Sequence, residues 1–251
     1  MTSLADKMNQ IGLRHVGEQV DDIVALATKK RMSPVQLLEY IYEREAHDRA
    51  CRGLERRLAR SRIGRFKPMA DFDWSWPKRI DQRAVESALA LDFLDGARNI
   101  VLVAPQGLGK TMIAQNIAFQ AVQAGHSVLF TTAAQLLLDL AGQESSRALD
   151  RRLRHYSQFR LLCIDELGYL SYDNRNADLL FQVVSRRYEH KSIVLTTNLA
   201  FSDWPTIFPN ATCATALIDR IVHHAEVLSI EGDSYRLRDA EVTQKRRRTR
   251  S

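Results

Sequence analysis

The chain has 251 residues, enough for one large domain or for a nucleotide-binding domain with a small second one. Hydrophobic residues make up 45% of the chain and support a buried core, but no apolar run is long enough to cross a bilayer. The net charge of +6 is compatible with a polyanionic partner without identifying one. Three isolated cysteines, and a start unlike a signal peptide, favour a cytoplasmic protein over a disulfide-linked secreted one.

The first third of the chain is predicted to be helical. Apolar residues recur at helical spacing between residues 16 and 27. A second helix is predicted to begin after Ser33, because Pro34 suits the first helical position and Gln36 can complete a capping box. We expect this helix to run to about residue 60. The apolar positions expected to form the buried stripes are Val16, Val20, Ile23, Val24, Ala27, Leu38, Ile41, Tyr42, Leu54 and Leu58.

The later half of the second helix is strongly basic. Its arginines repeat at spacings that place them on one helix face, and Glu55 is the only acid between positions 49 and 67. A solvated face is the ordinary interpretation of a charge run. Here the charge is nearly all of one sign, and arginine suits phosphate contact, so we expect this face to bind the DNA backbone. The predicted DNA contacts are Arg49, Arg52, Arg56 and Arg60.

Residues 64–80 are predicted to be a linker into a second domain. Its aromatic residues Phe72, Trp74 and Trp76 have two interpretations, packing on an adenine ring or anchoring the linker to the core, and the sequence leaves both open. An aspartate at position 81 is expected to cap a helix that continues through residue 94.

From residue 99 onward, strands and helices are predicted to alternate. Apolar, β-branched runs indicate strands at 99–103, 127–132, 160–164 and 192–196, with helical patterns between them. Strands separated by helices predict an α/β fold, a parallel sheet with helices on both faces. The arginines between residues 147 and 156 could face DNA, a neighbouring subunit or water, and the sequence does not rank these three.

The stretch Ala104-Pro-Gln-Gly-Leu-Gly-Lys-Thr111 follows the first of these strands and precedes a helix, the context of a Walker A phosphate loop. Its backbone N–H groups and the helix N-terminus can bind phosphate. We expect Lys110 to reach the β- and γ-phosphates and the Thr111 hydroxyl to hold Mg²⁺. Ala104 replaces the first glycine of the usual pattern. The predicted ATP-binding residues are Gly107, Leu108, Gly109, Lys110, Thr111 and Met112.

Polar residues follow the third and fourth strands. Asp165 and Glu166 end an apolar strand 55 residues after Lys110, the form of a Walker B segment. Asp165 is predicted to hold Mg²⁺, and Glu166 to act as general base for the water that attacks the γ-phosphate. Asn198 is predicted to contact that water and the γ-phosphate as a sensor; a strand-end cap is the competing interpretation.

Many separate motifs in the chain resemble one family. Over about residues 4–240 the chain is similar to the IstB-like proteins, AAA+ helper ATPases of insertion-sequence transposition related to the DnaC helicase loaders. Ala104, Gln106 and Met112 depart from the family pattern, while the phosphate-binding residues of the loop remain. The motifs that carry the resemblance are Asp165-Glu-Leu-Gly-Tyr-Leu170, Arg187-Tyr-Glu189, Thr197-Asn-Leu199, Trp204, Asp219-Arg-Ile-Val-His-His224 and Gly232-Asp-Ser-Tyr-Arg-Leu237.

The resemblance implies an AAA+ P-loop NTPase core that binds ATP between adjacent subunits of a homo-oligomer. By the same likeness, Arg220 is the arginine finger acting on a neighbour's ATP, and Arg236 is the sensor-2 arginine acting in its own subunit. Arg186 and Arg187 are a weaker alternative for the finger. The likeness further implies ATP-dependent assembly on double-stranded DNA, DNA bending and delivery of target DNA to a partner transposase.

Two other functions are weighed against this one. A DnaC-like helicase loader would dock a helicase through its N-terminal part, and the arginine face favours duplex DNA instead. A metabolic P-loop kinase is disfavoured because no acceptor-substrate site is recognisable.

The predicted organisation is a small all-helical N-terminal DNA-binding and assembly domain over 1–67, an AAA+ ATPase domain over 68–240 and a basic, disordered tail over 241–251. His223 and His224 suggest metal, but no acid or cysteine is spaced in the sequence to complete a site, so helix packing near Arg220 is the favoured interpretation.

Overall fold

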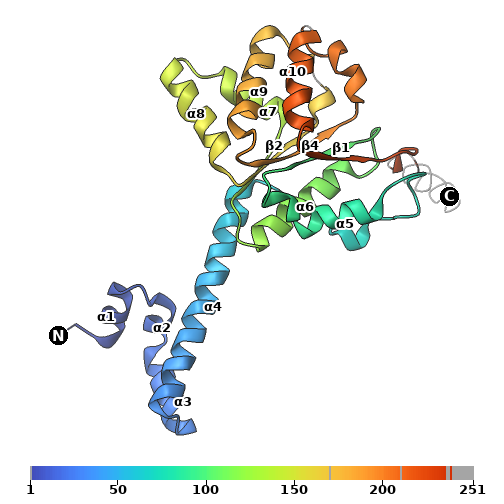
Figure 1. The fold of residues 1–251 in the computed structure, drawn as a ribbon. Helices are drawn as coiled ribbons and strands as arrows, with labels where there is room; N and C mark the ends of the chain where they lie inside the picture. The colour runs from blue at the N-terminus through green and yellow to red at the C-terminus, as the bar shows by residue number, and fades with distance from the viewer. Residues whose placement is uncertain (1, 170, 210, 236–237, 239–251) are drawn as a thin grey trace, which may run out of the picture. The chain divides into compact units, whose positions relative to one another are not determined.

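The computed structural model describes residues 2–169, 171–209, 211–235 and 238. The chain divides into two compact units, Met1–Arg56 and Arg57–Ser251. Figure 1 shows that the N-terminal unit is helical and that the second unit combines a sheet with helices. Across the described ranges, no helix is long and apolar enough to span a membrane.

The N-terminal unit consists of short helices followed by the start of a long one, which continues into the second unit. The predicted capping box opens the long helix, because the Ser33 N–H donates to Gln36 Oε1 at 2.8 Å and the Gln36 N–H donates to Ser33 Oγ at 3.3 Å. Its end at residue 61 agrees with the predicted length. The helices are α1 (Leu4–Gln10), α2 (Arg14–Glu18), α3 (Val20–Lys30) and α4 (Pro34–Ser61).

The core of the N-terminal unit is small. Val16, Val20, Ile23 and Ala27 are buried, as their helical spacing predicts. The prediction of burial was wrong for several other positions, because too few elements pack on these helices to cover all their apolar residues. The exposed fractions are 49% for Val24, 65% for Leu38, 73% for Tyr42 and 39% for Leu58.

One face of α4 therefore carries exposed apolar side chains. Leu38 and Tyr42 are joined by Val35, which is 63% exposed, and the three residues follow the i, i+3, i+7 spacing of a single helix face. We call this set the α4 apolar stripe.

The second unit is built on a five-stranded sheet whose strand order is β2-β3-β4-β1-β5. All four pairings between neighbouring strands are parallel. Four of the strands were predicted within one or two residues; the edge strand β5 was not, because its mixed polar sequence is only partly buried. The strands are β1 (Asn99–Val103), β2 (Val128–Thr132), β3 (Leu161–Asp165), β4 (Ser192–Thr197) and β5 (Ala225–Ser229).

Helices cover both faces of this sheet, which confirms the predicted α/β fold. In Figure 1, α5 and α6 lie on one face, while α7, α9 and α10 lie on the other. The α-helices are α5 (Gln82–Ala90), α6 (Lys110–Gln123), α7 (Ala133–Ala141), α8 (Ser146–Gln158), α9 (Asn174–Arg187) and α10 (Ala211–Val222). The 3₁₀ helices are η1 (Met69–Asp71), η2 (Asp92–Leu94), η3 (Leu167–Tyr169) and the longer η4 (Phe201–Thr206).

Side chains alternate between the two faces along each strand. Val101 of β1, Ile164 of β3 and Leu195 of β4 belong to the large buried cluster formed with α7, α8, α9 and α10. Ile113 and Ile117 of α6 are completely buried in the other layer. The sheet is thus packed on both faces, and this packing positions the residues that follow its strands.

The helix predicted after Asp81 begins as expected but is shorter than predicted. Asp81 caps α5 as expected, since the Ala84 N–H donates to its side chain at 3.0 Å. The helix ends at Ala90 rather than at residue 94, because Leu91 adopts a left-handed conformation with φ of 72°.

The residues that follow Arg56 belong to the second unit. Ile63 shows this, because its carbonyl accepts a hydrogen bond from Gln115 Nε2 at 3.0 Å.

Arg187, the last residue of α9, is completely buried. Burial lowers the pKa of its guanidinium to about 9. The group ties α9 to neighbouring backbone segments, so it cannot reach another subunit, and its weaker candidacy as an arginine finger is ruled out. Its carbonyl acceptors are Tyr156 at 2.8 Å, Phe159 at 3.0 Å, Arg160 at 3.4 Å and Ser192 at 2.6 Å.

Candidate nucleotide-binding site

Three strands end at one edge of the sheet, and the predicted site residues follow them. β1 leads into the loop 104–111, and β3 ends at Asp165. Val103, the last residue of β1, pairs with Thr197 at the end of the neighbouring β4. The phosphate loop, the carboxylates and the residues after β4 are therefore brought together where parallel α/β sheets bind ligands.

The phosphate loop needs its two glycines for conformation and for space. Gly107 and Gly109 have φ of +79° and +89°, in the left-handed region that disfavours side chains. A Cβ on Gly109 would lie 2.5 Å from a ring carbon of Phe72, and one on Gly107 would lie 2.1 Å from Ser234 Oγ. The backbone N–H groups of this loop are thus held close to neighbouring segments, ahead of the α6 N-terminus.

Ala104 fits the loop without strain. Its φ is outside the left-handed region, its side chain is 2% exposed, and its N–H donates to the Thr197 carbonyl at 3.2 Å. The departure from the usual glycine therefore leaves the loop geometry intact. Leu108 is also 2% exposed and anchors the loop from within.

Lys110 begins α6 and is 7% exposed. Its ammonium group donates to the carbonyls of Ala104 at 2.6 Å and Pro105 at 2.8 Å. The charge is consequently held inside the loop, where phosphate oxygens can exchange with carbonyl oxygens.

Asp165 is the centre of a buried polar cluster. It is 4% exposed, and the Thr111 hydroxyl lies 3.1 and 3.0 Å from its two carboxylate oxygens. The Thr196 hydroxyl also donates to Asp165 Oδ1. Hydroxyl and carboxylate oxygens are the hard donors that Mg²⁺ prefers, so the pair of Thr111 and Asp165 fits the ion predicted from the sequence.

Glu166 differs from Asp165 in exposure and in backbone. Its side chain is exposed and lines a cavity beside the phosphate loop, and its φ is +64°. Its backbone N–H donates to Thr196 Oγ1 at 3.0 Å, so the same threonine contacts the Glu166 backbone and the Asp165 carboxylate. Sequence reasoning missed Thr196; the polar run that ends β4 was the signal that could have found it.

Asn198 follows β4 at the same edge, and its Oδ1 is buried with no hydrogen-bond partner among the described residues. A Cβ on Gly168 would lie 2.2 Å from that oxygen, so the glycine after β3 lets the amide sit close. A buried, unpaired amide oxygen beside the Walker B turn is consistent with a polar group that interacts with a ligand.

The cavity has a volume of about 420 Å³, within the range of ligand sites. Phe72, Trp76 and Tyr235 supply aromatic walls, and Trp74 packs edge-on against Phe72 with ring centroids 4.7 Å apart. Because Phe72 and Trp76 line this cavity, their position favours the first of the two interpretations, contact with an adenine ring. Further lining residues include Arg65, Gly107, Leu108, Gly109, Lys110, Thr111, Met112, Glu166, Tyr169 and Thr196.

A segment near the C-terminus closes one side of the cavity. The Tyr235 N–H donates to the Gly107 carbonyl at 3.0 Å, and Trp76 Nε1 donates to the Asp233 carbonyl at 2.8 Å. The Arg238 guanidinium lies 4.4 Å from the centre of the Trp76 ring. Arg236, the predicted sensor-2 residue, lies outside the described residues.

Arg220 is placed away from its own cavity. Its guanidinium stacks 4.2 Å from the ring centre of Phe181, which joins α10 to α9. Among the described residues that line the cavity, Arg220 is not included. Arg186 pairs with Asp150 at 2.8 Å.

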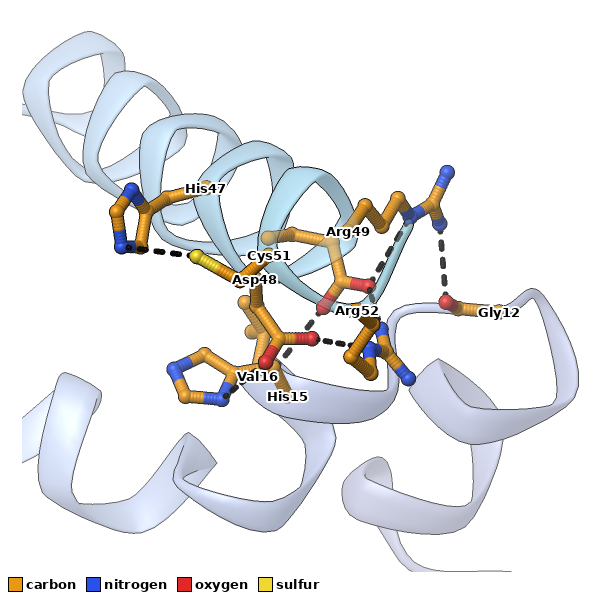
Figure 2. A network of polar contacts seen from close by, with 9 residues as sticks. Gly12, His15, Val16, His47, Asp48, Arg49, Cys51 and Arg52 are labelled. Carbon is orange, nitrogen blue, oxygen red and sulfur yellow. Dashed lines mark hydrogen bonds and ion pairs between the residues drawn. The ribbon is translucent and has the colours of Figure 1, made fainter. Parts of the chain in front are cut away.

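The predicted DNA-binding arginines differ in their surroundings. Figure 2 shows Arg49 and Arg52 within a polar network of the N-terminal unit. Arg49 pairs with the buried Glu45 at 3.1 Å, and Arg52 pairs with Asp48 at 2.6 Å. Arg56 and Arg60 are exposed on α4.

The arginines of α8 also fall into two groups, those paired with an aspartate and those exposed at the surface. Arg152 pairs with Asp139, and Arg154 pairs with Asp150 at 2.6 Å. Arg147 and Arg151 are exposed.

Comparisons with known proteins agree with this geometry. Residues 6–243 match the family described as IstB-like ATP binding protein. A relative from Pseudomonas aeruginosa, the ATP-binding protein of insertion sequence IS21, is 35% identical over 95% of this chain and 90% of its own length. The crystal structure of DnaI resembles 68% of this chain and 91% of its own, with a TM-score of 0.54 and 20% identity. The DnaC helicase loader resembles 64% and 97%, with a TM-score of 0.51 and 19% identity.

Proposed function

Because this chain belongs to the IstB-like family of ATP-binding proteins, which accompany insertion sequences, we propose that it is an ATP-hydrolysing, DNA-binding regulator of transposition. It self-assembles on double-stranded DNA, bends it and presents target DNA to a partner transposase, and hydrolysis controls the assembly. The observation that supports the proposal is the contact of Thr111 with Asp165, which joins the phosphate loop to the strand end predicted to hold Mg²⁺.

The residues of the site have separable roles in the proposed reaction. The N–H groups of the loop and the α6 N-terminus bind the phosphates. The Lys110 ammonium exchanges its two carbonyl partners for β- and γ-phosphate oxygens. Glu166, exposed to the cavity, accepts a proton from the attacking water, and Asn198 orients that water.

Thr111 and Asp165 would hold Mg²⁺, which when bound supplies positive charge to the β- and γ-phosphates. Thr196 connects the two acidic residues, because its hydroxyl donates to the Asp165 carboxylate and accepts a hydrogen bond from the Glu166 backbone N–H. The hydroxyl thus links the backbone of the proposed base to a proposed metal ligand.

The position of Arg220 supports action on a neighbouring subunit. It stacks on Phe181 and lies outside the described lining of its own cavity, so it can stabilise developing phosphate charge only where another subunit's site meets α10. Arg236 keeps its proposed role as the sensor acting within the subunit. The active species is therefore a homo-oligomer with ATP between subunits.

Duplex DNA is the proposed nucleic-acid partner. Arg56 and Arg60 are exposed for phosphate contact, and Arg49 and Arg52 would exchange carboxylate partners for phosphates on binding. Contacts of this kind are largely independent of sequence. The basic tail 241–251 is proposed to add nonspecific affinity.

The test is a sizing experiment on duplex DNA with ATP, ADP or no nucleotide. We expect large assemblies with ATP, and their loss or weakening in Arg220→Ala. Arg186→Ala, which removes the weaker finger candidate paired with Asp150, should assemble normally, and loss of assembly in this variant but not in Arg220→Ala would assign the finger to Arg186 instead. Assembly that ignores the nucleotide would contradict the proposal.

A DnaC-like helicase loader is the second candidate. The observation that favours it is the α4 apolar stripe, because a docking helix needs exposed apolar residues. Binding to single-stranded DNA alone, without ATP-driven growth on duplex, would select this function.

A further inference from the structure

Three exposed side chains meet at the ends of two helices in the second unit. Glu189 follows α9, and His223 and His224 lie between α10 and β5. One ligand atom from each lies within 4.8 Å of the others, and His224 Nε2 is 3.5 Å from Glu189 Oε1. The carboxylate that the sequence could not supply to the histidine pair thus comes from a distant segment. We propose that these residues form a binding site for a divalent transition metal, with Zn²⁺ as its best match.

The donor set determines the class of metal. Two imidazoles and one carboxylate form the ligand set of zinc sites that keep a fourth position for water. Imidazole nitrogen favours Zn²⁺, Cu²⁺ and Ni²⁺ over Mg²⁺ and Ca²⁺, which prefer oxygen. Tetrahedral zinc with bonds of about 2.0–2.1 Å separates its ligand atoms by roughly 3.3 Å. The side chains of Glu189 and His224 are 55% and 44% exposed, so they can rotate to close this distance.

The backbone beneath the histidines is held in place. The Asn99 N–H donates to the His224 carbonyl at 2.8 Å, and the Asn99 side chain donates to the Ile221 carbonyl at 2.9 Å. The His223 N–H closes the last turn of α10 on Asp219 at 3.0 Å. Only the side chains would have to move on metal binding.

Hydrogen bonds also hold the backbone on both sides of Glu189. The Tyr188 N–H donates to the Val184 carbonyl at 2.9 Å, and the following His190 N–H donates to the Arg187 carbonyl at 2.9 Å. Glu189 has a φ of +59°, a left-handed conformation that is uncommon for a long side chain. This turn directs the chain back toward β4 beside the end of α10.

Tyr188 supplies an outer-shell partner. Its hydroxyl lies 2.7 Å from His223 Nδ1, which leaves Nε2 as the metal-binding nitrogen. Its ring also stacks near both histidines, with centroids 6.0 Å from His223 and 6.3 Å from His224. Metal-ligating histidines characteristically use their second nitrogen in such a hydrogen bond, which fixes tautomer and ring orientation.

The test uses the full-length, nucleotide-free protein titrated with Zn²⁺ by calorimetry and with Co²⁺ by visible absorption. We expect one saturable site per chain, with the absorption of a four-coordinate Co²⁺ ion. Glu189→Gln, His223→Ala and His224→Ala should each weaken Zn²⁺ binding by more than the roughly 10–100-fold that loss of an outer-shell partner costs. Tyr188→Phe should fall within that range.

His47→Ala is the control, because His47 lies 3.5 Å from Cys51 and offers metal a two-residue alternative in the N-terminal unit. Binding that survives His224→Ala and disappears in His47→Ala would overturn the proposal, as would the absence of saturable binding. Lys110→Ala should bind Zn²⁺ normally, which separates this site from the ATPase. Unchanged melting temperatures of the metal-free Glu189, His223 and His224 variants, all altered at exposed positions, would confirm that they fold.

Discussion

The two units of the chain differ in which groups provide hydrogen bonds to their buried polar side chains. In the second unit, buried Asp165 and Arg187 have several partners each, fixed by the sheet and its helices. In the N-terminal unit, the buried carboxylate of Glu45 depends on the Val16 N–H and on arginines at the surface. The candidate nucleotide-binding site is thus fixed from inside its unit, while the N-terminal unit carries charged and apolar side chains at its surface.

The largest expected effect tests the rigidity of the second unit. Arg187→Met should cost at least about 3 kcal/mol of unfolding free energy, because several buried carbonyls lose their donor. Arg186→Ala should cost less than about 1 kcal/mol, since its pair is partly exposed. Denaturant unfolding measures both, and equal losses would contradict the structural role of Arg187.

Two glycine substitutions separate backbone strain from steric contact in the second unit. Gly109→Ala and Gly125→Ala both place alanine at a positive φ, and each should lose about 1–2 kcal/mol of stability. Only Gly109 has a neighbour in the way, the ring of Phe72, while a Cβ on Gly125 would meet open space. ATP affinity, measured by titration, should therefore fall in Gly109→Ala alone. A similar loss in Gly125→Ala would show that backbone strain, not contact, controls the loop.

Acid should weaken the N-terminal unit through Glu45. Burial opposes ionisation of this carboxyl, but the Val16 N–H, Arg49 and Arg52 outweigh it and lower the pKa from 4.5. A lowered folded-state pKa stabilises the fold above pH 4.5, and that contribution is lost as the pH falls below this value. The protection factors of amides in α2 and α3, which correct for the intrinsic pH dependence of exchange, should fall on acidification, and Glu45→Gln should abolish the part of this dependence attributable to Glu45. An unchanged pH profile in Glu45→Gln would refute the assignment.

The smallest expected effect is at the α4 apolar stripe. Leu38→Ser should change stability by no more than about 0.5 kcal/mol, because the side chain is 65% exposed. Ile23→Ala, at a buried position of the same unit, should cost about 2–5 kcal/mol. Unfolding measurements compare them, and a large loss in Leu38→Ser would show that the stripe is covered.

Local patterns predicted much of this molecule from its sequence. The phosphate loop, the carboxylates after β3 and four strands are encoded by contiguous residues, so periodicity and spacing are enough to find them. The edge strand β5 lacks such a signal.

What the sequence could not predict depends on contacts between distant segments. The threonine that joins Asp165 to Glu166, the burial of Arg187 and the approach of Glu189 to His224 each require the folded sheet. The exposure of Leu38 depends on which described residues of its unit pack on α4, and its helical spacing alone does not specify this.

Mixing two inactive variants tests whether ATP is hydrolysed between subunits. Arg220→Ala keeps a complete cavity but lacks the proposed finger, and Glu166→Gln keeps the finger but lacks the base. Each alone should lose most ATP turnover on duplex DNA, by about 10²–10⁴-fold for the base. A mixture at constant total protein should recover turnover, because the Glu166→Gln subunit supplies Arg220 to its neighbour's intact site. A mixture as inactive as its components would contradict hydrolysis between subunits.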